Sequence, residues 1–327
     1  MYVLRLQNTE YVLQIVIHHM ICDDWSLEIL LSELGVLYSA YTQGIAADLA
    51  PLDWQYADYA LWQRERLQGT VLEEHLSYWK EHLYRAPHSS GLPPDRSRQS
   101  LESYGRAVHR FDWSMQTARR LAQMSRTHGA TVFTLLLCAL LVVLGGWSWQ
   151  NDVVVGTMVA GRTRRELMGL IGLFVNALPL RATLTGDPQL GELLGRIRNT
   201  TDDAYAHQDL PFGKLLTELK SPVNRGQMPI FQVLLTEDDV PARTFDAPGI
   251  IIGCESRNPA TVRFDLAVHV VQNLSGVQGL VEYAAPLYDP TRIEQFTRAL
   301  ERCLQQMSER PGSRLSELSA RSRLQIH

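Results

Sequence analysis

The sequence predicts an α+β protein, or an α/β protein with mixed sheets, in which strands and helices follow one another without strict alternation. Its 327 residues are 45% hydrophobic and 20% charged, as in an ordinary globular protein. Short β-branched runs occur beside stretches in which apolar residues recur every three or four positions, the spacing of one buried helix face. The regular βαβ order of a doubly wound sheet is missing. A chain of this length favours two lobes over one large core.

The first third of the chain is expected to form a hairpin followed by helices. A polar turn joins two short apolar runs that are typical of strands. Beyond Asp23 and Asp24, leucines and tyrosines recur at helical spacing, so either aspartate can be the N-cap of a helix that ends near Gly44. The other elements expected here are strands at residues 3–6 and 11–17 and helices at residues 54–67 and 71–83.

A change in composition separates this part from the rest of the chain. Residues 86–106 are rich in Pro, Ser, Gly and Arg and lack apolar periodicity, which is typical of a linker. We therefore expect a first lobe at residues 1–105 and a second lobe at residues 106–327. The elements expected in the second lobe are strands at residues 107–113, 152–160, 174–184, 231–236, 264–271 and 280–283, and helices at residues 115–128, 131–145, 188–206, 211–219 and 290–307.

Composition argues against several classes of function. The net charge of −4, with no Lys/Arg cluster, predicts no nucleic-acid partner and no membrane surface. The four cysteines are far apart and form no CxxC pair, so they indicate reduced thiols rather than a zinc site or a disulfide framework. The apolar run from Val132 to Trp147 is shorter than a membrane span, and the N-terminus lacks the pattern of a signal peptide. We expect a cytoplasmic protein.

Two adjacent histidines at the end of the second expected strand form the main candidate site. His18 and His19 follow an apolar run and are followed by Asp23. Neighbouring side chains of a strand point to opposite faces, so one imidazole can face a cleft while the other anchors the turn. Histidine suits proton transfer near neutral pH. Two other interpretations stay open. One is a buried histidine pair with Asp23 as a helix cap, and the other is a metal site, against which the opposed side chains argue.

The segment around these histidines resembles the HHxxxDG active-site motif of the condensation domains of nonribosomal peptide synthetases, which is followed by Trp-Ser. In this chain the segment is IHHMICDDWS. Further segments are similar to other motifs of the same family, in the same order, and the resemblance covers nearly the whole chain. They are DYALWQ at residues 58–63, LSYWKEHL with the later LPPDRSR, the run at residues 153–181 that contains Phe-Val-Asn, AHQDLPFGKLL at residues 206–216 and RFDLAVHV at residues 263–270.

The resemblance implies a fold like that of chloramphenicol acetyltransferase, with two lobes in a V around a central tunnel. Carrier proteins of this family deliver a donor acyl or peptidyl thioester and an acceptor aminoacyl thioester, between which an amide bond forms. The implied partners are these carrier proteins, and an adenylation domain where the chain is part of a larger synthetase. The resemblance implies no cofactor and no metal bound by the domain, because the phosphopantetheine arms belong to the carrier proteins.

The motif implies a role for each of its polar residues. His19 matches the second histidine, which positions the attacking amine or accepts its proton. His18 matches the first histidine and is expected to be structural. Asp23 matches the family aspartate, which implies an ion pair with an arginine that shapes the turn; Arg162, or an arginine upstream of this chain, can supply it. An aspartate beside a guanidinium stays ionised and is a poor proton acceptor.

Later motifs add further candidates for active-site support. Trp62 matches the Trp of the helix motif. It can be an aromatic residue of the core or have a direct role in the site, and the sequence favours neither interpretation. Asn176 matches the Asn of Phe-Val-Asn; its amide can bond across the tunnel floor or to the pantetheine chain, or belong to a structural network. His207 and Gln208 match the later motif, in which residues 209–212 are expected to shape a helix start.

The chain departs from the family pattern in two places. Asp24 stands where the motif has Gly, which tolerates backbone angles that strain other residues and lets substrate approach, so activity is in question. The family's opening motifs, with an arginine-containing segment, are missing before His18. An incomplete first lobe exposes a strand edge and apolar faces. We expect lower stability than that of a full domain, or association with something that covers the gap.

Other functions stay open beside amide bond formation. An epimerisation domain shares the motif, but DYALWQ and GLFVNALPLR are more similar to condensation domains. Heterocyclisation domains have aspartates in place of His18 and His19. A catalytically degenerate module that docks carrier proteins would tolerate Asp24. A free-standing acyltransferase that uses a soluble thioester would share the histidine motif but not residues 153–181.

Overall fold

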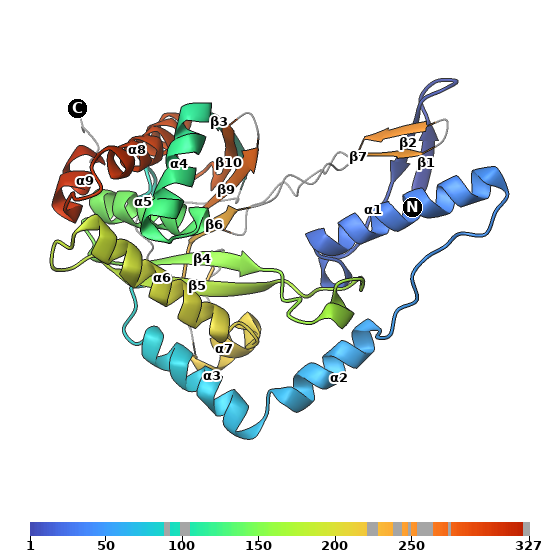
Figure 1. The fold of residues 1–327 in the computed structure, drawn as a ribbon, viewed down its shortest axis with the longest axis horizontal. Coiled ribbons are helices and arrows are strands. Elements are labelled where there is room, and N and C mark those ends of the chain that lie inside the picture. The colour runs from blue at the N-terminus through green and yellow to red at the C-terminus, as the bar shows by residue number, and fades with distance from the viewer. Residues whose placement is uncertain are drawn as a thin grey trace. The chain divides into compact units, whose positions relative to one another are not determined.

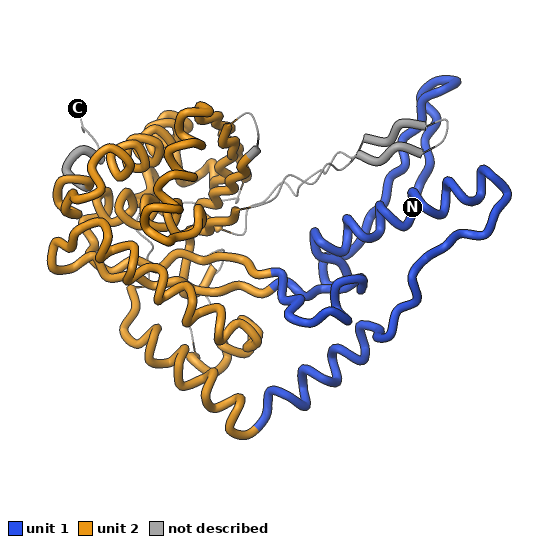
Figure 2. The backbone as a smooth tube through the Cα atoms, in the orientation of Figure 1, with its two compact units in different colours: residues 1–68, 160–175, 241–256 blue, residues 69–159, 176–240, 257–327 orange. Residues whose placement is uncertain are grey.

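The computed structural model describes residues 1–87, 92–98, 105–220, 228–237, 244–247, 250–253, 264–273 and 276–322. Contacts divide the chain into two compact units, coloured separately in Figure 2. Unit 1 comprises Met1–Gln68, Ala160–Val175 and Pro241–Ser256, and unit 2 comprises Gly69–Val159, Asn176–Val240 and Arg257–His327. The first boundary between these units lies earlier than residue 105, where composition predicts the boundary between lobes. The division into lobes stays a prediction.

Unit 1 contains a hairpin, two longer helices and a second pair of short strands. Its elements are β1 (Tyr2–Arg5), β2 (Tyr11–Gln14), α1 (Asp24–Gln43), α2 (Tyr56–Arg66), β7 (Thr244–Ala247) and β8 (Ile250–Gly253). β1 and β2 pair antiparallel, with Leu4 opposite Val12, and are exposed along their whole length. α1 begins where the Asp23 side chain accepts the N–H of Ser26. It ends at Gly44, whose φ of 68° is the left-handed conformation that favours glycine.

Unit 2 is organised around one six-stranded sheet (Figure 1). Its strands, in spatial order, are β3 (Arg106–Trp113), β10 (Gly276–Ala284), β9 (Leu266–Asn273), β6 (Val233–Glu237), β4 (Asp152–Val159) and β5 (Asn176–Thr183). β6 pairs in parallel with both β9 and β4, and the other pairs are antiparallel. The prediction of a mixed sheet is confirmed. The β-branched run of β4 is buried from Val153 to Thr157, as expected for an interior strand.

Helices cover this sheet, and one of them forms the centre of the core. The helices of unit 2 are α3 (Gly69–His82), α4 (Met115–His128), α5 (Val132–Ser148), α6 (Leu190–Ala206), α7 (Phe212–Glu218), α8 (Pro290–Glu309) and α9 (Leu315–Ser322). α5 is buried on nearly all sides because its sequence is apolar all round. It packs against β4, α6, α8 and α9. Among the described residues no single helix is long and apolar enough to span a membrane; only α4 and α5 together, bent by 102°, meet that test.

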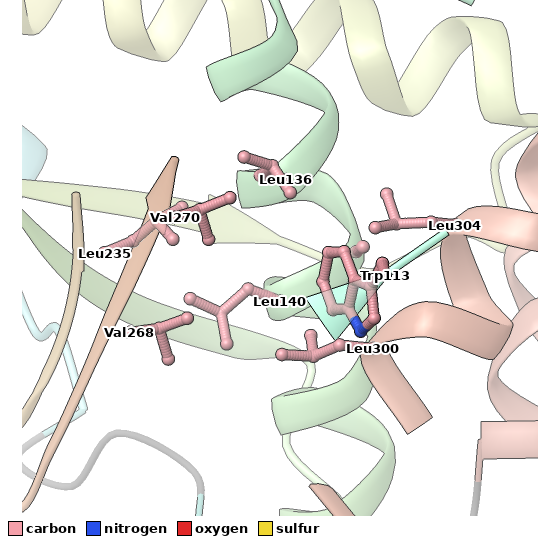
Figure 3. Close-up of a pocket in the computed structure, with 9 residues that line it drawn as sticks. Trp113, Leu136, Leu140, Leu235, Val268, Val270, Leu300 and Leu304 are labelled. Atoms are coloured by element: carbon pink, nitrogen blue, oxygen red, sulfur yellow. The ribbon is translucent and has the colours of Figure 1, made fainter. Parts of the chain in front are cut away.

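A small apolar cavity lies in this core, between the sheet, α5 and α8 (Figure 3). Trp113 reaches the cavity from β3, Leu136 and Leu140 reach it from α5, and Leu300 reaches it from α8. Ligand sites combine an apolar lining with a few polar groups that fix orientation, whereas the residues that line this cavity are apolar. We regard the cavity as a packing defect of the core.

The expected elements are present with shifted ends, and a few were missed. The strand expected at residues 11–17 ends at Gln14, where its pairing with Tyr2 of β1 ends. The strand expected at residues 280–283 runs from Gly276 to Ala284 because it pairs with both β3 and β9 over that length. The sequence did not predict β7, β8 or α9. Arg263 of the RFDLAVHV segment and part of residues 86–106 lie outside the described residues.

Candidate active site

The two histidines lie on a short 3-10 turn between β2 and α1. The turn covers His19–Ile21, and both His18 and His19 are exposed. His18 Nδ1 accepts the N–H of Met20 at 3.1 Å, so this imidazole caps the turn. The geometry suits the structural role expected of His18, which stays a prediction.

The His19 ring is held by one hydrogen bond to the main chain. Its Nδ1 lies 2.8 Å from the carbonyl oxygen of Cys22. A carbonyl oxygen can only accept, so Nδ1 carries the proton and donates. In the neutral ring, Nε2 then has a free lone pair. This arrangement can accept a proton from a group that approaches Nε2, which is the chemistry expected of His19.

Asp23 is buried and accepts hydrogen bonds at both carboxylate oxygens. Oδ1 accepts the N–H of Ser26 at 2.9 Å, and Oδ2 accepts the N–H groups of Phe174 and Val175 at 2.9 and 3.3 Å. Burial alone would raise the pKa of Asp23, but these hydrogen bonds and the charge on Arg162 lower it below its ordinary value. Asp23 is therefore ionised at neutral pH and joins α1 to residues 172–175.

Arg162 is the arginine that pairs with Asp23. Its Nη2 lies 3.2 Å from Asp23 Oδ1, and both side chains are buried. Nη1 donates to the carbonyl oxygens of Leu167 and Leu170, and the guanidinium lies 4.1 Å from the centre of the Phe174 ring. Of the two partners that the sequence left open for Asp23, the structure contains this one.

Asp24 does not occupy a position that requires glycine. It is the first residue of α1, is exposed, and is not among the residues with positive φ. The predicted backbone strain is therefore absent at this residue, and that part of the expectation is wrong. An acid in the first turn is favoured by the helix dipole.

Burial, followed by the charges on Asp23 and Asp24, raises the pKa of the Cys22 thiol.

Trp62, on α2, belongs to an aromatic cluster. Its ring centre lies 6.2 Å from those of Trp54 and Tyr59. The Arg164 guanidinium lies over both indoles, 5.3 Å from Trp62 and 5.2 Å from Trp54. Tyr59 in turn packs on Phe174, 4.7 Å away. These contacts favour the interpretation of Trp62 as a packing residue, and a direct role for it stays untested.

Asn176 organises the turn between α6 and α7 in unit 2. Its Nδ2 donates to the carbonyl oxygens of Gln208 and Leu210 at 2.9 and 2.8 Å. Its Oδ1 accepts the N–H of Phe212 at 2.9 Å. All three bonds are to main-chain groups of the AHQDLPF segment, which favours the structural network over contact with a pantetheine chain.

His207 lies in a second group of rings that sequence reasoning did not predict. Its Nδ1 is 3.0 Å from Nδ1 of His75, and its carbonyl oxygen accepts the indole N–H of Trp79 at 3.2 Å. Tyr78 stacks on His207 with 4.1 Å between ring centres. Tyr78 and Trp79 lie three and four residues after His75 on α3. This spacing indicates a buried helix face, but it does not predict that His207 packs against it. Among the described residues, no group of three or more His, Cys, Asp or Glu is arranged to hold a metal ion.

Comparisons with known proteins identify the family. The condensation domain model matches residues 1–325. The chain belongs to the condensation domain family. It is 38% identical over 301 residues to one of the linear gramicidin synthase proteins of Brevibacillus parabrevis, covering 90% of this chain and 4% of the synthase. It is 34% identical over 324 residues to phosphinothricin tripeptide synthetase PhsC of Streptomyces viridochromogenes, covering 99% of this chain and 30% of that protein.

Solved structures agree with this assignment. The X-domain from teicoplanin biosynthesis has a TM-score of 0.81 and 29% identity, covering 92% of this chain and 70% of that one. The condensation domain of the MokA polyketide synthase, at 21% identity and a TM-score of 0.74, covers 91% of this chain and 69% of that one and shows the fold alone. The prediction of a mixed α and β fold like that of chloramphenicol acetyltransferase is confirmed. The chain spans less than a tenth of the linear gramicidin synthase proteins that it matches.

Proposed function

We propose that this condensation domain forms an amide bond between two carrier-bound thioesters. The amine of an acceptor aminoacyl thioester attacks the carbonyl carbon of a donor acyl or peptidyl thioester. The carbon–nitrogen bond forms, the carbon–sulfur bond breaks, and the thiol leaves. The observation that carries the proposal is the hydrogen bond from His19 Nδ1 to the Cys22 carbonyl, which leaves Nε2 free to accept a proton.

The proton released by the amine needs an acceptor, and His19 is the group that fits. Asp23 cannot serve, because its pKa is lowered and its oxygens already accept hydrogen bonds from Ser26, Phe174 and Arg162. His19 is exposed, and its Nε2 can take the proton and later return it to the leaving sulfur. Holding the amine near the thioester contributes to the rate independently of proton transfer.

The partners follow from this reaction. The donor and acceptor carrier proteins bring their substrates on phosphopantetheine arms, so the chain itself needs no cofactor, and an adenylation domain loads the acceptor carrier. A cytoplasmic location is part of the same proposal. It is supported by the thiols of Cys22 and Cys138, which are buried and not in disulfides, as expected in a reducing compartment.

The test is amide formation from aminoacyl thioesters loaded on excised donor and acceptor carrier proteins. The product is measured by mass spectrometry with chiral analysis, which also detects epimerisation of the donor. We expect His19→Ala to reduce the single-turnover rate by at least a hundredfold. The control is His128→Ala, in the last turn of α4, and should leave the rate unchanged. A His19→Ala variant as fast as the wild type would refute the proposal.

A second candidate is a module that binds proteins without catalysis. It is favoured by the likeness, at 28% identity and a TM-score of 0.82, to a teicoplanin X-domain whose structure is a complex with OxyB. Asp24 also favours this candidate, because it places a charged side chain beside the turn where the motif has glycine. No turnover by the wild-type chain, with carrier proteins still bound in calorimetry, would support this candidate over the first.

A further inference from the structure

One peptide unit links His19 to a segment far away in the sequence. The carbonyl of Cys22 accepts the Nδ1–H of His19 at 2.8 Å, and the N–H of Asp23, in the same peptide unit, donates to the Gly172 carbonyl at 3.0 Å. A trans peptide unit is planar, and its C=O and N–H point in opposite directions. Fixing the N–H on Gly172 therefore fixes the direction in which the carbonyl meets His19.

Gly172 is held in turn by the side chain of Ser26. Ser26 Oγ accepts the N–H of Gly172 at 3.0 Å and the Nη2–H of Arg162 at 2.8 Å. Asp23 Oδ1 lies 2.6 Å and the Gly172 carbonyl 2.9 Å from the same oxygen. A hydroxyl has two lone pairs and one proton. The two N–H donors occupy the lone pairs, and the proton goes to Asp23 or Gly172, so the hydroxyl uses its whole capacity.

The other side of Gly172 is closed by an aromatic ring. A Cβ atom at this position would lie 2.1 Å from the ring of Tyr56, so only glycine allows the approach. The Tyr56 hydroxyl also donates to the carbonyl of Leu173 at 2.9 Å. Ser26 is fully buried, which keeps water from competing for its hydroxyl. Gly172 is therefore confined between the Ser26 hydroxyl and the Tyr56 ring.

We propose that Ser26 is a positioning residue for His19 and acts through Gly172 and the Cys22–Asp23 peptide unit. The inference rests on the proposed role of His19 as proton acceptor. The hydroxyl determines where the Gly172 carbonyl lies, and that carbonyl orients and polarises the peptide unit. The polarised Cys22 carbonyl keeps the proton on Nδ1 of His19. Nε2 is then the nitrogen that faces the amine in its unprotonated form.

The test compares Ser26→Ala with Ser114→Ala in the intact chain. Ser26 lies in the first turn of α1, and Ser114 is the N-cap of α4 in unit 2, so the loss of Ser114 controls for a general effect of removing a serine hydroxyl at the start of a helix. Nitrogen-15 spectra of the histidine rings, assigned with His19→Ala, report the tautomer of His19 at neutral pH. Amide formation on loaded carrier proteins reports kcat and the KM for the acceptor carrier separately.

We expect the wild type and Ser114→Ala to show the Nδ1–H tautomer of His19. Ser26→Ala should show a mixture of tautomers and a kcat at least tenfold lower, with KM changed less than twofold. A Ser26→Ala variant that folds and keeps both the tautomer and kcat would overturn the inference. If that variant does not fold, Ser26→Cys, which has a similar shape and a weaker hydrogen-bonding group, is measured in the same way against the same outcomes.

Failure of the proposed function would look different. A wild-type chain that forms no amide, while Ser26→Ala still changes the tautomer of His19, would refute the reaction and leave the positioning of the ring by Ser26 in place. Wild-type turnover that depends on His19, with no effect of Ser26→Ala on tautomer or rate, would refute the positioning role alone.

Discussion

Arg162 carries a charge on a buried side chain and pairs with the buried carboxylate of Asp23. Because a buried charge is costly without its partner, we expect this pair to have a large effect on stability. Replacing Arg162 with leucine leaves the Asp23 carboxylate buried without its cation. We predict that Arg162→Leu lowers the free energy of unfolding by about 3–5 kcal/mol. The control is Arg298→Leu, which breaks an exposed pair with Glu294 and should cost less than about 0.5 kcal/mol. Guanidinium titration of both variants measures the difference, and equal losses would contradict the prediction.

Asp24 tests whether the family glycine is needed for the backbone of this turn. Because Asp24 already has a helical conformation, glycine relieves no strain and adds flexibility in the unfolded chain. We predict that Asp24→Gly lowers the free energy of unfolding by about 1 kcal/mol. Asp24→Ala, which removes the charge but keeps a good helix former, should lose less. A gain in stability from Asp24→Gly, measured in the same titration, would show that the backbone is strained after all.

His82 gives unit 2 a specific response to acid. Burial, followed by the charge on Arg181, lowers the pKa of His82 from 6.5 to about 4, and its Nε2 lies 3.3 Å from the backbone N of Arg181. Between these two pH values the unfolded chain binds more protons than the folded chain, so stability falls as the pH falls from 6.5 to about 4. We predict a loss on the order of 3 kcal/mol over this window, less any loss from other groups.

The control variant for this pH effect is His82→Gln, whose amide oxygen can still accept the Arg181 N–H but does not titrate. The slope of unfolding free energy against pH should become shallower in this variant. A slope identical to that of the wild type would assign the acid response between pH 6.5 and about 4 to groups other than His82. The lowered pKa of Asp23 makes its contribution to stability disappear only at lower pH, below its ordinary value of 3.8.

How far the site could be predicted differs from residue to residue. His19 and Asp23 are close together in sequence and follow an apolar strand, so a local pattern was enough to single them out. The partner of Asp23 is 139 residues away, and a sequence alone does not decide which arginine reaches a given carboxylate. Ser26 and Gly172 were not predicted because their importance lies in main-chain contacts that residue type does not encode.

At the scale of elements, Asn176 at the start of β5 holds the turn between α6 and α7. Replacing it with aspartate keeps one acceptor but points a carboxylate oxygen at the carbonyls of Gln208 and Leu210, which both need a donor. We predict that Asn176→Asp lowers the free energy of unfolding by about 2 kcal/mol or more. Hydrogen exchange at the Phe212 amide, which donates to the Asn176 side chain, should report the loosened turn.

The matched control for this turn is Gln208→Ala. Within the described part of the chain the Gln208 side chain bonds locally, to the carbonyl oxygen of Tyr205, so its loss should leave the Phe212 amide protected. Equal exchange in Asn176→Asp and in the wild type would show that the turn is held by other contacts.

Elements with strong periodicity were predicted well, and elements fixed by distant pairing were not. α1 and α5 follow from the spacing and density of their apolar residues. β7 and β8 pair with each other and were not predicted, although each is as long as β1 and β2, at four residues. The order of strands in the sheet could not be derived, because β6 is inserted between β4 and β9 through parallel pairs that leave no local sequence signal.

At the scale of the whole molecule, the two compact units differ in the size of their cores. The buried cluster of unit 1 consists of Tyr59, Leu167, Leu170 and Phe174, whereas that of unit 2 includes α5, α8 and the interior of the six-stranded sheet. Since apolar burial is the main stabilising contribution, we predict that unit 1 unfolds at a lower denaturant concentration than unit 2.

Hydrogen exchange followed by mass spectrometry distinguishes the two units directly. Peptides from α1 and α2 should lose protection at a lower guanidinium concentration than peptides from α5 and α8. The two units are compared within the same sample, so no variant is needed as a control. A single transition shared by peptides from both units would contradict the prediction.

The pairing of β3 with β10 bears on how the chain is made in the cell. β3 ends at Trp113, but its neighbour in the sheet begins at Gly276, and every residue of β3 pairs with a residue of β10. During synthesis, β3 leaves the ribosome long before its partner exists. The nascent chain must then carry an unpaired β3 and the apolar α5 until translation reaches residue 284. During that interval, β3 and α5 are the segments to which chaperones that bind extended apolar chains on the ribosome would bind.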